Sequence, residues 1–182
     1  TALWPAGAYA RDPHVTPIRP GTPPGDYQVQ VVAYEQGQPN NRLFVMNERG
    51  EPIGWTFDAT SAKVMQIEVL PPRGPVPRSA VQPEVEVSRA AGALRLIGYD
   101  RLPAQLNAGD SFRFTLYWQA DGPITTTPTV WFRLLHSNAA PIAFEIEPVP
   151  GYPVANWQPG DIWRAEHVVR VPPGAAGGLW RT

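Results

Sequence analysis

Four side chains in this sequence could bind a ligand through an aromatic ring or a guanidinium group: Trp131, Tyr117, Arg133 and Arg113. Because strand residues alternate between the two faces of a sheet, Trp131 and Arg133 lie on the face opposite Phe132. If Phe132 faces the core, Trp131 is exposed. We predict that Trp131 then lies beside Tyr117 and Arg113 of a neighbouring strand. Such a surface stacks sugar rings, but exposed aromatic side chains also mark contacts between modules or subunits.

Two pairs of carboxylates have a spacing that allows catalysis. Glu145 and Glu147 are two residues apart in a predicted strand, as are Glu84 and Glu86, so each pair shares a face. Paired carboxylates can hydrolyse glycosidic bonds. A solvated strand face gives the same pattern, and no neighbouring group that would tune a pKa is evident. We therefore predict no catalytic residues and no enzymatic activity.

Metal and cofactor chemistry has little support in the sequence. The chain has no cysteine, and its three histidines, His14, His136 and His167, are isolated from one another. No second ligand stands at the spacing of a metal site. Phosphate-binding loops, dinucleotide fingerprints and calcium loops are also lacking. We expect neither a metal nor a cofactor.

The charge balance and the apolar runs exclude two classes of partner. The 182 residues include 15 Lys and Arg and 16 Asp and Glu, giving a net charge of −1. Binding to nucleic acid needs a strong excess of positive charge. The longest uninterrupted apolar run, Ala139 to Phe144, is far shorter than the ~20 residues of a membrane-spanning helix. We predict no nucleic-acid partner and no membrane insertion by this segment.

Alternating apolar residues predict strands throughout the chain. In 26–35 Tyr27, Val29, Val31 and Ala33 fall on one face, and in 111–119 Phe112, Phe114, Leu116 and Trp118 do so. Two similar hairpins are predicted over 42–57 and 133–146, and further strands over 63–70, 93–99 and 162–171. The 23 prolines disfavour long helices. Many short strands indicate an all-β fold, an antiparallel β-sandwich of the immunoglobulin-like or jelly-roll type.

An internal repeat divides the chain. Residues 4–29 align without a gap to 157–182, with identities at Trp4/Trp157, Gly7/Gly160, Arg11/Arg164, His14/His167, Val15/Val168, Pro20/Pro173, Gly21/Gly174 and Gly25/Gly178. Such a repeat indicates tandem units. We therefore predict that 1–70 is the C-terminal part of one unit, 71–90 is a proline-rich linker, and 91–182 is the N-terminal part of the next unit.

Two arrangements follow from this division. Either the chain contains parts of two tandem sandwiches, or residues 1–70 and 91–156 assemble one sandwich in permuted order. The second arrangement leaves fewer strand edges open. One of the two repeated segments would then be redundant or would swap onto a neighbouring molecule, which gives a swapped homodimer.

Several motifs resemble those of a known group of proteins. They are Leu94-Arg-Leu-Ile-Gly-Tyr-Asp100, Asn107-Ala-Gly-Asp110, Phe114-Thr-Leu-Tyr-Trp-Gln-Ala120, the segment from Tyr152 to Gly160 and the segment from Pro23 to Val31. Their order resembles tandem β-sandwich accessory modules of bacterial membrane glycosyltransferases of the mannosyltransferase-like superfamily and of related surface proteins. In that family the module runs continuously from the Gly-Tyr-Asp strand to a strand like 63–70, and here the order differs.

The resemblance implies a function without assigned catalytic residues. It implies a non-catalytic structural or interaction module of a larger multidomain protein, located outside the cytoplasm or at the cell surface. Its partners would be neighbouring domains of the same polypeptide and cell-surface polysaccharide. The alternative is a carbohydrate-binding module that uses exposed aromatic side chains on a sheet face.

Overall fold

The computed structural model describes residues 13–35, 38–42, 44, 46–51, 61–136, 138–176 and 180–181. Within these residues the chain is all-β, and two short 3₁₀ turns, Arg78–Ala80 and Val154–Asn156, are its only helical segments. The described strands form antiparallel sheets that are not closed. This confirms the predicted all-β fold class.

The strands follow one another in the order β1 to β11. Their bounds are β1 Gly25–Val32, β2 Tyr34–Glu35, β3 Gln38–Arg42, β4 Ser61–Val69, β5 Val85–Ala91, β6 Leu94–Tyr99, β7 Ser111–Ala120, β8 Val130–His136, β9 Ile142–Ile146, β10 Ile162–Arg170 and β11 Trp180–Arg181. They make a four-stranded sheet in the order β10-β7-β6-β5, a three-stranded sheet in the order β11-β8-β9, and two separate pairs, β1-β4 and β2-β3.

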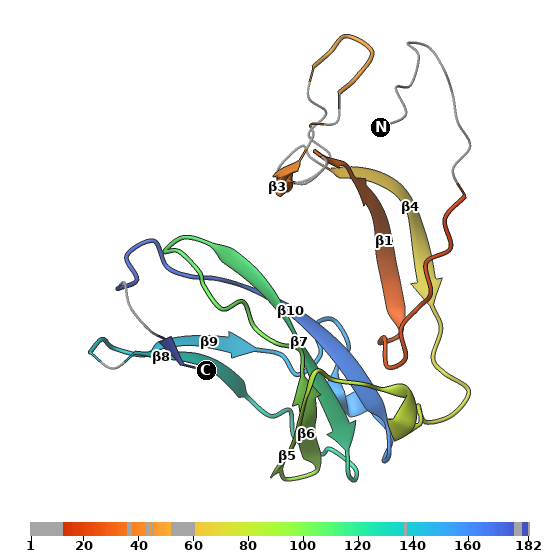
Figure 1. Ribbon diagram of the computed structural model, residues 1–182. Coiled ribbons are helices and arrows are strands. Elements are labelled where there is room, and N and C mark those ends of the chain that lie inside the picture. Colours follow the sequence, from red (N-terminus) through yellow and green to blue (C-terminus); the bar gives the residue numbers. More distant parts are fainter. Residues whose placement is uncertain are drawn as a thin grey trace.

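The four-stranded and three-stranded sheets share a hydrophobic core (Figure 1). Phe112 and Phe114 of β7 pack against Phe132 and Leu134 of β8. The rings of Phe114 and Phe132 are stacked with centroids 4.5 Å apart. A second cluster around Trp118, Trp157 and Trp163 continues this core toward the other end of β7. The predicted core face of β7 and the predicted 133–146 hairpin are therefore confirmed.

The opposite face of β7 is also buried near its C-terminal end. There Tyr117 packs with Ile97, Ile162 and Val81, and Val76 lies against them. Val76 and Val81 belong to the proline-rich segment before β5, which covers this face. The cover is tight at Gly98, where an added Cβ would lie 2.3 Å from Pro83 Cγ.

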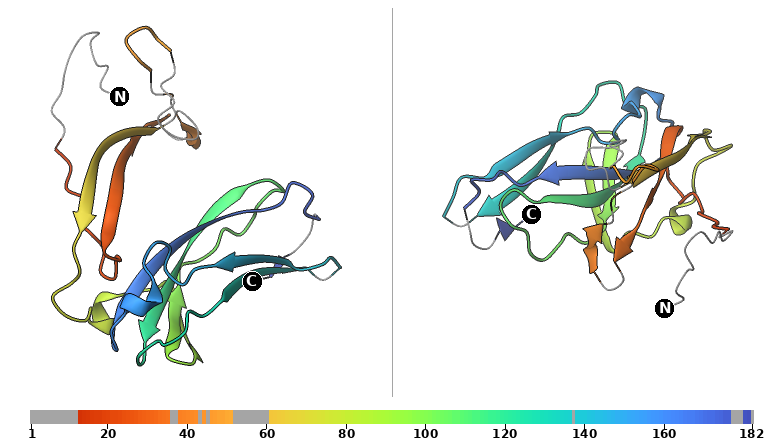
Figure 2. Two further views of the ribbon diagram at one scale, coloured as in Figure 1. Left: turned by 180° about the vertical axis from the view of Figure 1, so that it is seen from behind. Right: turned by 90° about the horizontal axis from the view of Figure 1, so that it is seen from above.

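The β1-β4 hairpin stands apart from these sheets. In Figures 1 and 2 the hairpin lies at the opposite end of the molecule from β8 and β9. Its pairing runs from Gly25↔Val69 to Val32↔Ser61, with an irregularity beside Val29. Among the described strands, β1 and β4 pair only with each other.

The predictions for the linker, the first hairpin and the division into units have different outcomes. The predicted linker 71–90 contains strand β5, which pairs with β6, so only its first part lacks strands. The predicted hairpin over 42–57 lies partly outside the described residues, which include its turn at 47–51. The division into 1–70 and 91–182, and the choice between tandem and permuted units, stay predictions.

Within the described ranges, no helix has the length and apolar character needed to cross a membrane.

Candidate functional site

The outer face of the β8-β9 pair carries the first candidate surface. Trp131 is 51% exposed there, as predicted, and Arg133 is exposed two residues further along β8. In the register of β8 and β9, Trp131 stands opposite Glu145. Residues that stand opposite each other in an antiparallel pair share a face. The surface therefore combines an indole ring, a guanidinium group and a carboxylate.

Tyr117 does not belong to this surface, and its predicted exposure is wrong. It lies on β7 in the four-stranded sheet and is only 5% exposed. The proline-rich segment before β5 covers it, which alternation along β7 alone could not reveal. Its hydroxyl donates to the carboxylate of Asp100, at 3.1 Å from Oδ1. Burial and the hydrogen bond with Asp100 raise the pKa of Tyr117, and Arg164 opposes the shift.

Arg113 is also remote from Trp131, because it lies on the outer face of the four-stranded sheet. Its guanidinium group contacts the carboxylate of Glu166 on β10 at 3.2 Å. Arg164 lies 3.8 Å from the other oxygen of Glu166 and 3.3 Å from the hydroxyl of Thr115. The four predicted ligand-binding residues are therefore split between the outer faces of two sheets, with the core between them. They do not form one groove.

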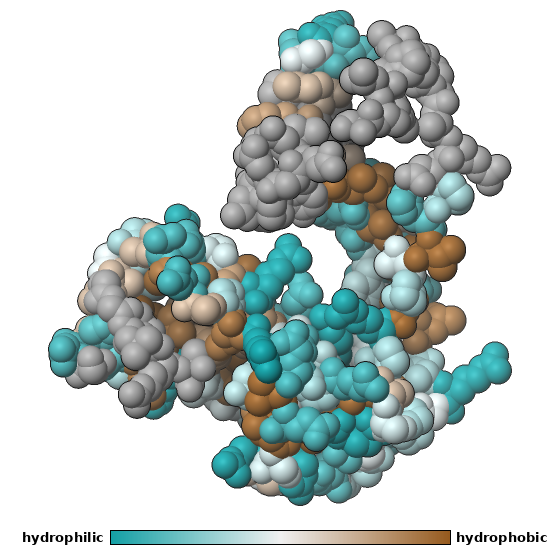
Figure 3. Space-filling model, in the orientation of Figure 1, coloured by the Kyte–Doolittle hydropathy of each residue, from teal (hydrophilic) through white to brown (hydrophobic). Residues whose placement is uncertain are grey.

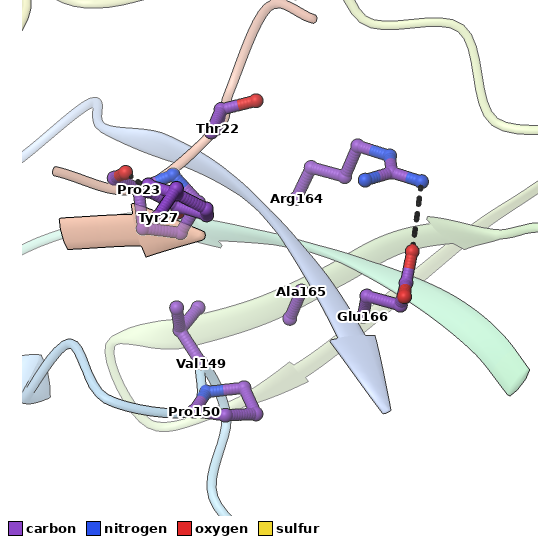
Figure 4. Close-up of a pocket in the computed structure, with 8 residues that line it drawn as sticks. All are labelled: Thr22, Pro23, Tyr27, Val149, Pro150, Arg164, Ala165 and Glu166. Atoms are coloured by element: carbon purple, nitrogen blue, oxygen red, sulfur yellow. Dashed lines mark hydrogen bonds and ion pairs between the residues drawn. The ribbon is translucent and has the colours of Figure 1, made fainter. Parts of the chain in front are cut away.

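A pocket of about 280 Å³ lies where the start of β1 meets β10 (Figure 4). It is lined by Thr22, Pro23 and Tyr27 at the start of β1, by Val149 and Pro150 after β9, and by Arg164, Ala165 and Glu166 of β10. Burial raises the pKa of Tyr27, and the positive charge of Arg164 opposes this shift. The polar groups that line the pocket are the hydroxyls of Thr22 and Tyr27, the guanidinium group of Arg164 and the carboxylate of Glu166.

At this pocket, a backbone contact joins the segment before β1 to β10. The carbonyl of Gly21 accepts a hydrogen bond from the backbone N–H of Arg164 at 2.7 Å. Gly21 has a φ of 80°, and a Cβ there would lie 3.2 Å from Arg164 N. Glycine adopts such a φ without strain. The Tyr27 hydroxyl donates to the carbonyl of Pro23 at 2.8 Å. These contacts fix the base of the hairpin on the outer edge of β10.

His167 is a buried histidine. It lies on β10 with its ring 5.1 Å from the ring of Phe114. Burial lowers the pKa of His167 from 6.5 to about 4, and the carbonyl of Pro148 and the carboxylates of Glu147 and Glu166 oppose the shift. Nε2 has no hydrogen-bond partner among the described residues. The ring is therefore neutral at pH 7.

The two candidate carboxylate pairs belong to different sheets, one at β5 and the other at β9. Glu145 and Glu147 are both exposed near the end of β9. Glu86 forms an ion pair with Arg78 at 2.9 Å, and Glu84 accepts a backbone N–H. In the part of the chain that the structure describes, no group of three or more His, Cys, Asp or Glu side chains could hold a metal ion.

The sequence identified the apolar face of β1, but not that some of its residues are more than half exposed. Tyr27, Val29 and Val31 share this face, and Met65 stands opposite Val29 on β4. Val31 is 56% exposed and Met65 is 54% exposed. Figure 3 shows apolar residues, in brown, along the hairpin. We call this surface, made of Tyr27, Val29, Val31, Met65 and Ile67, the hairpin face.

Comparison of the chain with protein-family models, with curated proteins and with solved structures gives no match.

Proposed function

We propose that this chain is a non-catalytic structural and interaction module of a larger multidomain protein. The observation that carries this proposal is the hairpin face, on which Val31 and Met65 are more than half exposed. An apolar strand surface with an open edge is costly in water and is a site for pairing with another polypeptide. The neighbouring domains of the same polypeptide are the partners that this function requires.

The fold and place of the module form part of the same proposal. The shared core of the four-stranded and three-stranded sheets supports a β-sandwich of the immunoglobulin-like or jelly-roll type. The sequence motifs that resemble accessory modules of bacterial membrane glycosyltransferases support a location outside the cytoplasm or at the cell surface. In such a place, a rigid sandwich would position its neighbouring domains near cell-surface polymers.

Carbohydrate binding is a second candidate function because Trp131 is half exposed on a sheet face. A sugar ring would stack on the indole, and Arg133 and Glu145 would bind its hydroxyl groups. This surface differs from the predicted one, since it contains Glu145 and lacks Tyr117 and Arg113.

An oligosaccharide-array screen separates the two functions. The interaction module gives no saturable binding from well-folded protein, because its surface recognises polypeptide. Any positive sugar would be titrated against intrinsic tryptophan fluorescence of the unmodified chain and of Trp131→Ala. Saturable binding that is lost in Trp131→Ala would overturn the first function in favour of the second.

A further inference from the structure

Part of the β8 edge has no neighbour among the described strands, and the repeat indicates which strand would fit there. β11 pairs with β8 only through Trp180↔His136 and Arg181↔Leu135, so the edge from Val130 to Leu134 has no described neighbour on that side. In the repeat, Trp180 is equivalent to Tyr27 at the start of β1. The strand that begins to pair with β8 is therefore the equivalent of β1.

A shared turn supports this equivalence independently of the identities. The N–H of Thr22 donates to the carbonyl of Arg19 at 3.1 Å. The N–H of Ala175 donates to the carbonyl of Pro172 at 3.0 Å, and these two residues occupy the equivalent positions of the repeat. In both places the turn leads into a strand, β1 in one case and β11 in the other.

The equivalence fixes a register for β1 on β8. Placing Tyr27 where Trp180 lies sets Tyr27 opposite His136, and the antiparallel pairing then continues through Val29 opposite Leu134 and Val31 opposite Phe132. Leu134 and Phe132 face the shared core. A slip of one residue would turn every side chain to the other face. The register that follows from the repeat alone therefore directs the hairpin face toward the core.

The polar face of β1 fits the same register. Gln28 and Gln30 point away from the hairpin face and would stand opposite Leu135 and Arg133, both exposed. The resulting sheet has the order β4-β1-β8-β9, four strands that oppose the four strands of β10-β7-β6-β5. This pairing covers the hairpin face and extends the core beside Phe132 and Leu134.

We propose that the β1-β4 hairpin of one chain pairs with the β8 edge of a second copy of this chain, where β1 replaces β11. A second copy is the occupant because the base of each hairpin is bonded to its own β10 through Gly21 and Arg164, at the opposite end of the molecule from its own β8 (Figure 2). Each copy both gives and accepts a hairpin, which closes a symmetric dimer. This inference rests on the proposed function, and it adds a second copy of the chain to the neighbouring domains as a partner.

Cysteine cross-linking tests the register directly, since the chain has no cysteine of its own. Gln30→Cys in one chain and Arg133→Cys in a second, tagged chain would be mixed, unfolded and refolded together, and treated with a mild oxidant or a short bis-thiol reagent. Opposite residues of a strand pair have Cβ atoms about 4.5–5.5 Å apart, within reach of such a link. We expect a tagged–untagged dimer as the main product.

The control replaces an arginine on the other open edge. Arg89 is exposed on β5, the last strand of the four-stranded sheet. Gln30→Cys mixed with Arg89→Cys should give a many-fold lower yield of cross-linked dimer. Equal yields, or no cross-link from the Arg133 pair, would overturn the proposal.

The doubly substituted chain, Gln30→Cys with Arg133→Cys, identifies the occupant. A product of twice the chain mass supports pairing between copies. A linked product of single-chain mass would show that each hairpin closes on its own β8 and would overturn the second copy as occupant. The array screen is independent of both results: a sugar bound at Trp131 overturns the proposed function without affecting this register, and a missing cross-link overturns the pairing alone.

Discussion

Replacing Phe114 by alanine is expected to lower the free energy of unfolding by about 3–5 kcal/mol. The ring is 4% exposed and packs between the two sheets. It stacks on Phe132 at 4.5 Å and on His167 at 5.1 Å. The substitution removes these contacts and leaves a cavity that a close-packed core cannot fill. The midpoint of urea-induced unfolding, followed by tryptophan fluorescence, measures the loss.

Trp131→Ala is the matched control for Phe114→Ala. It also removes an aromatic ring, but from the exposed outer face of β8, and exposed substitutions usually change the free energy of unfolding by no more than about 0.5 kcal/mol. Comparable losses in the two variants would contradict the assignment of Phe114 to the shared core.

The second large effect is a pH dependence that His167 confers on stability. Above pH 6.5 the imidazole of His167 is neutral in both the folded and the unfolded chain. Its protonation therefore does not lower the free energy of unfolding in that range. Below pH 6.5 the unfolded chain binds a proton, whereas the folded chain does not until about pH 4. The free energy of unfolding therefore falls between pH 6.5 and 4, by about 3 kcal/mol in total from this group.

His167→Phe isolates this contribution. The variant keeps a ring against Phe114 but has no group that titrates in this range. We expect its free energy of unfolding to fall less steeply between pH 6.5 and 4 than that of the unmodified chain. Parallel pH profiles would show that the His167 ring is already protonated, or accessible to protons, in the folded chain.

The sequence predicted the strands well because their residues alternate strongly. Phe112, Phe114 and Trp118 lie on the core face of β7, as their spacing indicates, and the hairpin of β8 and β9 forms with Trp131 on its outer face. Period-two alternation is a local property of one strand, so it needs no knowledge of the neighbouring strands.

The burial of Tyr117 depends on contacts that are distant in the sequence. Alternation placed it on the outer face of β7, and that face is indeed opposite Phe114. Val76 and Val81, in a segment that reads as a proline-rich linker, then cover it. The same limit applies to β5, of which residues 85–90 lie in that predicted linker. Which strand pairs with which, and what covers each face, follows from tertiary contacts that no single strand encodes.

Sedimentation velocity of three proteins tests the central claim that the hairpin face is an interface. The three are the unmodified chain, Val31→Lys and Val168→Lys. Val31 lies on the hairpin face and Val168 on the outer face of β10, and they are 56% and 60% exposed. A lysine at Val31 would place a charge against the core of the partner, which costs several kcal/mol. We predict a dimer for the unmodified chain and for Val168→Lys, and a monomer for Val31→Lys. The same sedimentation coefficient for all three proteins would contradict the account.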